Sequence, residues 1–166
     1  GVIPQISAVF GPCAGGAVYS PALTDFIVMS RKSSYMFVTG PKVAKAVTGE
    51  DISIDDLGGA DVHASKSGVA HFAVDDEKAG LELIRKLLGF LPQNNLEEPP
   101  QTICDDPIDR LEDDLNEIIP ESPNQPYDVK EIITRVVDYR EYLEFNESYA
   151  KNILVRIAKF DGMPVG

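Results

Sequence analysis

The chain has 166 residues, 43% of them hydrophobic, so it can bury one ordinary core and is neither fibrous nor wholly disordered. Its 27 Asp and Glu residues outnumber its 15 Lys and Arg residues, which gives a net charge of −12. A field of that sign repels phosphate backbones and anionic headgroups, so we expect neither nucleic acid nor a membrane surface as a partner.

The sequence carries no sign of export, membrane insertion or a metal-binding cysteine motif. Its apolar runs fall short of the roughly 20 residues of a membrane span, and the first residues lack the pattern of a signal peptide. Cys13 and Cys104 lie far apart without a CxxC spacing, so we expect two reduced thiols and no metal on this chain. We expect a cytoplasmic protein of a bacterium or archaeon, or a mitochondrial matrix protein of a eukaryote. Because the chain opens at Gly1 without Met and stops inside an apparent hairpin, we also expect an internal fragment.

The first half of the chain alternates predicted strands and helices. Residues 5–10 and 25–29 are short apolar segments that predict buried strands, separated by a glycine turn and a helix-length interval. A third strand is predicted at residues 34–38. Pro41 suits the first turn of the next helix, because its missing N–H would have no partner there. Residues 48–68 have little apolar periodicity and predict an ordered loop around one short helical turn.

Residues 76–91 give the clearest local prediction, a helix. Glu82 and Lys86 can pair one turn apart, and Pro92 ends the pattern. The apolar side chains recur at helical spacing, namely Leu81, Ile84, Leu87, Leu88 and Leu91.

Residues 97–117, here called the acidic segment, contain nine acidic residues and one Arg, with three prolines that interrupt any long helix. The segment predicts a linker, or a strip wrapped on a surface. The acidic residues could form a metal site or a site for a basic partner. No Asp-x-Asp-x-Asp-Gly calcium-loop pattern organises the carboxylates, so a solvated connector is the favoured interpretation.

The last forty residues predict a second sheet. Asp128 can cap a helix that has Glu131 at the capping-box position, and two strands follow at residues 141–145 and 153–160. Asp161-Gly162 is a strong hairpin turn signal, after which residues 163–166 would begin the return strand. The helix has one apolar stripe, formed by Val129, Ile132, Ile133, Val136 and Val137.

The stretch "FGPCAGGAVYSPALTD" places three glycines at a junction between a strand and a helix. Glycines let the backbone approach a ligand, and the N–H groups of a first helical turn have no partner inside the helix. The spacing GxxxGG matches neither GxGxxG nor GxxxxGK[ST], so a nucleotide-phosphate loop is not indicated. Two interpretations stay open on the pattern alone: an oxyanion hole formed by backbone amides, or glycines that allow close packing of helix on strand.

Other polar candidates have simple structural explanations. His63, Ser67 and His71 could form a polar relay, with Ser67 and His71 one turn apart in a helix, but hydrogen bonds to an ordered loop backbone are favoured. Cys13 lacks an evident base and is interpreted as a small buried residue. Ser20 lacks a G-x-S-x-G elbow, and no Ser-His-Asp order or carboxylate pair indicates a hydrolase.

Several separate motifs agree with one family. "GPCAGGAVYSPALTDFIVM", "SYMFVTGPKVAKAVTGEDISIDDLGGADVHASKSGVAHFAV" and "YAKNILVRIAKFDGMPVG" resemble the carboxyltransferase (β) subunit of propionyl-CoA carboxylase and related biotin-dependent acyl-CoA carboxylases. The resemblance runs in order through nearly the whole chain. One departure is Arg156, which stands where relatives usually have Gly in "NIVVGFAR".

The resemblance implies an α/β fold of the ClpP/crotonase type, a β-β-α superhelix. Residues 1–96 would be the C-terminal part of the N-terminal carboxyltransferase domain, residues 97–127 an acidic, Pro-rich linker, and residues 128–166 the start of the C-terminal domain. It also implies transfer of a carboxyl group from carboxybiotin to the α-carbon of an acyl-CoA, with propionyl-CoA giving methylmalonyl-CoA.

The resemblance also implies which groups do the chemistry. Backbone amides of Gly15 and Gly16 would form the oxyanion hole for the thioester enolate, and Ala17 would contact the substrate. Biotin would be carried on another subunit, and its liberated enolate would take the α-proton, so the protein would supply mainly positioning and oxyanion stabilisation. A second amide pair, for biotin, would fall beyond Gly166.

The implied partners are a biotin carboxylase and biotin carboxyl carrier subunit, acyl-CoA, and further copies of the subunit in a hexameric ring. Alternatives within the enzyme class are the carboxyltransferase subunit of acetyl-CoA carboxylase, methylmalonyl-CoA decarboxylase or glutaconyl-CoA decarboxylase. A non-catalytic scaffold with a crotonase fold is the alternative outside it.

Overall fold

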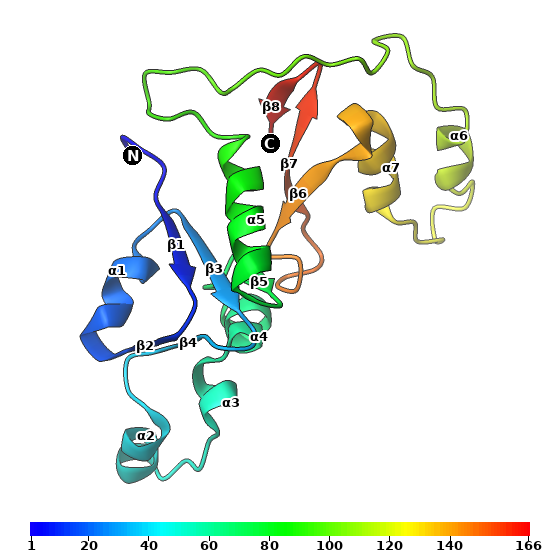
Figure 1. Cartoon of the computed structure of the whole chain (residues 1–166). Coiled ribbons are helices and arrows are strands. Elements are labelled where there is room, and N and C mark those ends of the chain that lie inside the picture. Colours follow the sequence, from blue (N-terminus) through cyan, green and yellow to red (C-terminus); the bar gives the residue numbers. More distant parts are fainter.

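The computed structural model describes all residues 1–166, and its first part is built on a parallel sheet (Figure 1). Three strands pair in the order β1-β3-β5: β1 (Ile6–Val9), β3 (Phe26–Ser30) and β5 (Phe72–Val74). The last four residues of β3 are buried, as expected for a central parallel strand covered on both faces. The predicted strands β1 and β3 are confirmed, whereas β5 was not predicted, and its place in the sheet is set by pairing with β3.

A second, two-stranded parallel sheet carries the glycine motif. It pairs β2 (Pro12–Ala14) with β4 (Tyr35–Phe37), and β4 was predicted while β2 was not. After β2 the chain forms a 3-10 turn, Gly15–Val18, and the four-residue helix α1 (Tyr19–Ala22). The predicted strand-to-helix junction is therefore correct, but most of the expected helix is replaced by a tight turn.

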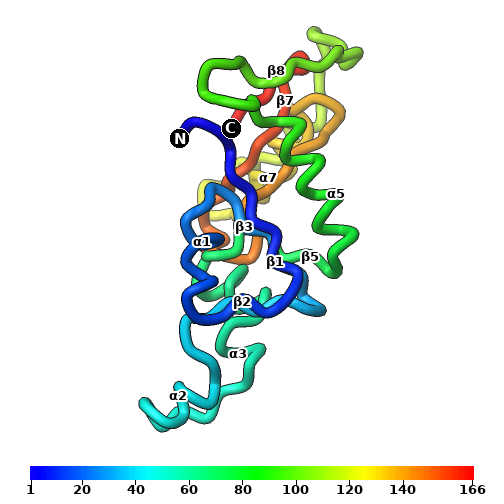
Figure 2. Tube along the Cα trace, turned by 60° about the vertical axis from the view of Figure 1, so that its left-hand side comes forward, coloured from blue at the N-terminus to red at the C-terminus, as the bar shows by residue number.

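Residues 41–67 are more helical than the sequence predicts. Helix α2 (Pro41–Thr48) begins at Pro41 as expected and projects away from the sheets in both views (Figures 1 and 2). The following loop was expected to hold one helical turn. It instead forms α3 (Ile54–Gly58), α4 (Ala60–Val62) and a π-helical turn, His63–Ser67. The buried residues of this region are small, since Ala60 and Ala64 are 3% and 7% exposed. Because they are alanines, the sequence shows no stripe of large apolar residues here.

Helix α5 (Glu77–Leu88) confirms the clearest local prediction. Asp76 caps it by accepting a hydrogen bond from the amide of Ala79 at 3.0 Å, and Leu87 is fully buried. The expected pairing of Glu82 with Lys86 was wrong, since Glu82 pairs with Lys78, one turn nearer the N-terminus of the helix, at 3.8 Å. None of the helices is both long enough and apolar enough to cross a membrane.

The last part of the chain forms the predicted second sheet. It contains α6 (Leu115–Ile118), α7 (Val129–Val136) and an antiparallel sheet of β6 (Tyr142–Phe145), β7 (Val155–Phe160) and β8 (Met163–Val165). Asp128 caps α7 by accepting from the amide of Lys130 at 2.8 Å. The hairpin turn at Asp161-Gly162 is also confirmed, with Gly162 at φ 74°.

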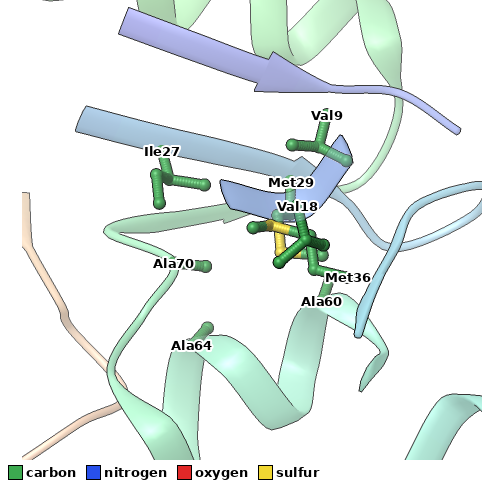
Figure 3. Packing of buried hydrophobic residues seen from close by; sticks show 8 residues of the cluster. All are labelled: Val9, Val18, Ile27, Met29, Met36, Ala60, Ala64 and Ala70. Atoms are coloured by element: carbon green, nitrogen blue, oxygen red, sulfur yellow. The ribbon is translucent and has the colours of Figure 1, made fainter. Parts of the chain in front are cut away.

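Two hydrophobic clusters form the core. The first joins β1, β3, β4, the 3-10 turn and the small residues of α4 and the π-helical turn, as Figure 3 shows. The second packs α5 against β3 and β5, and Leu143 of β6 is one of its buried members. The second sheet therefore packs on the first part of the chain through a shared core, in which Phe145 of β6 lies against Phe26 and Phe72 of the first sheet.

The acidic segment lies partly against the last part of the chain. The side chains of Asp106 and Glu112 are only 14% and 11% exposed, and both pair with Arg110. Arg140 also pairs with Glu112, at 3.0 Å. The interpretation as a solvated connector holds for exposed Glu97 and is wrong for Asp106 and Glu112, because basic side chains of the same chain neutralise them.

Arg156, the departure from the family pattern, is buried on β7. Its Nε donates to Glu144 on the neighbouring strand at 3.0 Å, and its guanidinium lies 3.8 Å from the ring centre of Tyr142. Glu144 also pairs with Lys130 of α7 at 2.9 Å. The arginine thus connects β7 to β6 through Glu144 and Tyr142.

Candidate functional site

The site predicted from the glycine motif is the 3-10 turn after β2. Ala14 is extended, with φ −131° and ψ 152°, and Gly15 then takes the left-handed conformation, with φ 67°. This sharp change of direction needs glycine at position 15, because a side chain disfavours positive φ. Gly16 and Ala17 complete the exposed side of the turn.

Strand pairing before the turn and a buried side chain at its end hold the turn in place. Cys13 pairs with Met36 and Ala14 with Phe37 in the β2–β4 register. Val18, the last residue of the turn, is 8% exposed and packs in the first hydrophobic cluster (Figure 3). The amides of the turn are therefore fixed by a buried anchor on one side and a strand on the other.

Open space lies in front of the turn. A Cβ atom added to Gly16 would meet nothing within 4 Å, and one added to Gly15 would meet only the carbonyl oxygen of Val38, at 4.0 Å. No side chain caps the N-terminus of the turn, and the first N–H groups of such a turn have no partner inside it. Amides so placed can hold an oxygen on which negative charge develops.

The other polar groups beside the turn do not form a catalytic set. Cys13 is half-buried and packs against the first cluster, which supports its interpretation as a packing residue. Tyr35 lies opposite Pro12 in the register. The negative charge of Asp55 raises the pKa of the Tyr35 phenol, which stays neutral near pH 7. Ser20 lies in the exposed helix α1, outside any elbow.

The two histidines make the hydrogen bonds to ordered backbone that were favoured. His71 Nδ1 accepts from the amide of Ile27 at 3.1 Å, and burial lowers the pKa of His71. His63 contacts the carbonyl oxygen of Met36 through Nε2 at 2.7 Å and the hydroxyl of Ser67 through Nδ1 at 2.8 Å. A relay of all three residues does not form, because Ser67 pairs with His63 across the π-helical turn and His71 binds the backbone of Ile27.

The largest cavity described lies away from the glycine turn, between the acidic segment and the corner before β6, here defined as residues Asp138–Arg140. It measures about 570 Å³ and is lined by Arg110, Arg135 and Asp138 among others. Two of its charged groups already pair with each other, since Arg110 binds Asp106 at 3.0 Å. No group of three or more His, Cys, Asp or Glu side chains is arranged to hold a metal ion.

One contributor to the site was missed at the level of the sequence, the backbone of β4. Its three residues form the strand that pairs with β2, and the carbonyl oxygen of Met36 lies within hydrogen-bond distance of His63 Nε2. No side-chain pattern signals such a role, because the groups involved are main-chain atoms. Only the pairing of β2 with β4, twenty-three residues apart in register, brings them together.

Comparison with known proteins gives a match over the whole chain. The carboxyl transferase domain family matches residues 1–166. The chain is 54% identical over 166 residues to the propionyl-CoA carboxylase carboxyltransferase subunit of Haloferax mediterranei, covering 100% of this chain and 32% of that protein. It is also 54% identical over 166 residues to methylmalonyl-CoA decarboxylase subunit alpha of Veillonella parvula, covering 100% of this chain and 33% of that protein. The chain thus spans about a third of the length of these relatives.

A solved structure gives the same result for the fold. Transcarboxylase 12S, described as a hexamer with methylmalonyl-coenzyme A and methylmalonic acid bound, superposes with a TM-score of 0.95 and 46% sequence identity. The match covers 99% of this chain and 32% of that one. It confirms the crotonase-like fold class that the resemblance implied.

Proposed function

Because the chain belongs to the carboxyl transferase domain family, we propose that it forms part of a carboxyltransferase subunit that moves a carboxyl group onto the α-carbon of an acyl-CoA. The carboxyl donor is carboxybiotin, held on another subunit, and the acyl substrate is propionyl-CoA, which becomes methylmalonyl-CoA. Acyl-CoA is the substrate class of the relatives by name, and methylmalonyl-coenzyme A occupies the transcarboxylase 12S structure.

The observation that carries the proposal is the uncapped turn at Gly15 and Gly16, with open space in front of it. Loss of the α-proton moves negative charge onto the thioester oxygen, and two amides aimed at that oxygen stabilise the enolate more than the neutral thioester. Stabilisation of this kind lowers the barrier because it is stronger in the transition state than in the ground state. Exposed Ala17, the next residue, contacts the acyl-CoA in this proposal.

This chain supplies one half of such a site. Gly162 is a glycine of the second sheet, and its amide already donates to the carboxylate of Asp138 at 2.8 Å. A Cβ on Gly162 would lie 1.8 Å from the carbonyl oxygen of Thr102, so no open space faces it. The Gly162 amide therefore does not fit the ureido oxygen of biotin, and we propose that the donor half of the site belongs to other residues of the intact enzyme.

We also propose the domain division that the family resemblance implies. We place residues 1–96 in the first carboxyltransferase domain, residues 97–127 in a linker and residues 128–166 at the start of the second domain. The proposed partners are a biotin carboxylase, a biotin carboxyl carrier and further copies of the subunit in a ring, and transcarboxylase 12S is described as a hexamer assembly. We also propose a cytoplasmic location, because the curated relatives are bacterial and archaeal proteins.

A second candidate function is the reverse transfer, from methylmalonyl-CoA to biotin. The observation in its favour is the identity to the Veillonella parvula decarboxylase subunit, which equals the identity to the Haloferax mediterranei carboxylase subunit at 54%. The same amides would hold the same enolate in both directions. The two functions differ in the partner that drives the reaction, so the product formed with purified partner subunits distinguishes them.

The substitution Gly16→Val in the full-length subunit tests the oxyanion assignment. The added Cβ meets no protein atom within 4 Å, so the variant should fold, while its side chain takes the space of the thioester oxygen. Keeping the oxygen away from one such donor should cost about as much as losing the donor, which typically lowers kcat by about 100- to 1,000-fold, or about 2.7–4 kcal/mol. The measurement is the rate of carboxylation of propionyl-CoA with labelled bicarbonate and the partner subunits.

Gly11→Val is the matched control. Gly11 lies in the same loop, and a Cβ there would also meet nothing within 4 Å, but its amide is outside the 3-10 turn. We expect near wild-type turnover for this control. Wild-type turnover of Gly16→Val would refute the oxyanion assignment.

A further inference from the structure

The Gly15–Gly16 turn depends on a strand whose other edge is held by a histidine. Strand β4 pairs with β2 on one edge, where the amide of Tyr35 donates to the carbonyl oxygen of Gly11 at 3.4 Å. Successive residues of a strand direct their backbone groups to opposite edges. The carbonyl of Met36 therefore faces the other edge, where His63 Nε2 lies 2.7 Å away.

The protonation of His63 follows from its two partners. A carbonyl oxygen only accepts, so Nε2 carries the proton and donates to Met36. In the neutral ring Nδ1 is then the acceptor, and it receives the hydroxyl of Ser67 at 2.8 Å. In the protonated ring Nδ1 would donate to the same hydroxyl oxygen. Either way Ser67 fixes the plane of the ring, and Nε2 stays aimed at Met36.

The contact is one of several that bring the helical region against β4. A Cβ on Gly58 would lie 2.3 Å from the Met36 carbonyl oxygen, and Gly59 forms an isolated bridge with Tyr35. Met36 itself is 2% exposed and packs with Val18 of the 3-10 turn (Figure 3). Without His63, the Met36 carbonyl would be buried without its side-chain donor, which is unfavourable and would be relieved by movement of β4.

We propose that His63, oriented by Ser67, is a positioning residue for carboxyl transfer: it fixes β4 and thereby the Gly15 and Gly16 amides that β2 carries. The inference rests on the proposed function of those amides. His63 acts through main-chain atoms and touches no substrate. A π-helical turn at His63–Ser67 suits this role, because such turns are often retained where function requires a particular side-chain placement.

The primary test compares His63→Leu with His63→Gln in the full-length subunit. Leucine is similar in size to histidine but has no N–H to donate to Met36. The side-chain amide of glutamine can donate from near the position of Nε2. Small misplacements of catalytic groups cost up to about 100-fold in rate. We expect His63→Leu to lower kcat by about 10- to 100-fold with the KM for propionyl-CoA within about twofold, because the amides act in the transition state. His63→Gln should restore kcat to within about threefold of wild type.

A second pair of variants keeps the test decisive if His63→Leu does not fold. Ser67→Ala frees the ring and should lower kcat several-fold at unchanged KM, while Ser67→Thr keeps the hydroxyl and should not. Ser65→Ala is the matched control, since the Ser65 hydroxyl in the same turn donates only to the backbone carbonyl of Asp61, at 2.6 Å. It should leave turnover unchanged.

The outcomes separate this inference from the proposed function. Wild-type kcat for Ser67→Ala, or equal kcat for folded His63→Leu and His63→Gln, would overturn the positioning role. A loss of melting temperature without a change in kcat would assign His63 to stability alone and would also overturn it. An active Gly16→Val variant would instead refute the oxyanion assignment, whatever the His63 variants do.

Discussion

At the scale of single residues, the site is made of main-chain atoms, and side chains serve to hold them. Gly15 supplies the left-handed conformation, Val18 anchors the turn in the core, and His63 binds the strand beneath it. His71 has a related role, since its Nδ1 accepts from the amide of Ile27 in β3. Both histidines therefore support backbone, one at each of the two parallel sheets.

The bond from Ile27 makes stability depend on the charge of His71. Burial lowers the folded pKa of His71 below its ordinary value of 6.5, and a proton on Nδ1 would also remove the acceptor. A lowered histidine pKa means that the stabilisation is fully present above pH 6.5 and is lost as the pH falls through the folded pKa. Acidification should therefore destabilise the wild type more than His71→Asn, which keeps an acceptor and does not titrate.

The measurement is the difference in melting temperature between the wild-type and His71→Asn full-length subunits from pH 8 to pH 5. We expect the wild type to lose its advantage progressively below about pH 6.5. His63 is present in both proteins and does not contribute to the difference. A difference that stays constant with pH would contradict this account of His71.

At the scale of elements, the acidic segment is tied to the β7–β8 hairpin. The amide of Thr102 donates to the carbonyl of Gly162 at 3.1 Å, and the amide of Asp105 donates to the Tyr139 hydroxyl at 2.7 Å. Asp138, 9% exposed, accepts from the amides of Asp161 and Gly162 and so closes the hairpin turn. The segment thus packs on the corner before β6, although it has no helix or strand before α6.

The substitution Gly162→Ala should destabilise this arrangement. A left-handed residue other than glycine costs about 1–2 kcal/mol, and Gly162 has φ 74°. The new Cβ would also lie 1.8 Å from the carbonyl oxygen of Thr102, so the acidic segment must move away. We expect a lower melting temperature of the full-length subunit and faster proteolysis within the acidic segment.

Gly49→Ala isolates the backbone contribution. Gly49 has φ 77°, but a Cβ there would meet nothing within 4 Å. It should lower the melting temperature less than Gly162→Ala and leave the proteolysis of the acidic segment unchanged. Equal effects of the two substitutions would show that the contact with Thr102 contributes nothing.

At the scale of the whole molecule, large apolar side chains remain uncovered along the acidic segment and just before it. Leu96, Ile103, Ile108 and Leu111 are 91%, 92%, 95% and 86% exposed. Large apolar side chains with this degree of exposure would be buried if other parts of an assembly packed against this segment. They agree with the proposal that the chain is one part of a larger, oligomeric enzyme.

We predict that the isolated 166-residue chain does not transfer carboxyl groups. It offers one amide pair, at Gly15 and Gly16, and the Gly162 amide is already bound to Asp138. The assay mixes the purified chain with carboxybiotin and propionyl-CoA, and the full-length subunit under the same conditions is the control. Methylmalonyl-CoA formed by the isolated chain would show that the second half of the site is dispensable.

Much of the fold could be predicted locally. The capped helices at Asp76 and Asp128, the strands β1, β3, β4, β6 and β7, and the turn at Asp161-Gly162 all follow from patterns within a few residues. The exposed amide turn at Gly15 and Gly16 was also located from the sequence, although its chemical role required the family resemblance. The oxyanion role itself stays a prediction.

What only the tertiary structure decided concerns contacts between distant segments. The strands β2 and β5 were not predicted, because they are defined by hydrogen bonds with partner strands elsewhere in the chain. The buried residues of the helical region before β5 are alanines, which do not produce an amphipathic pattern in the sequence. The sequence determined the local conformations, because propensity, capping and turn preferences act over a few residues. Pairing and packing determined which main-chain groups meet, such as His63 with Met36, because these interactions depend on proximity in space.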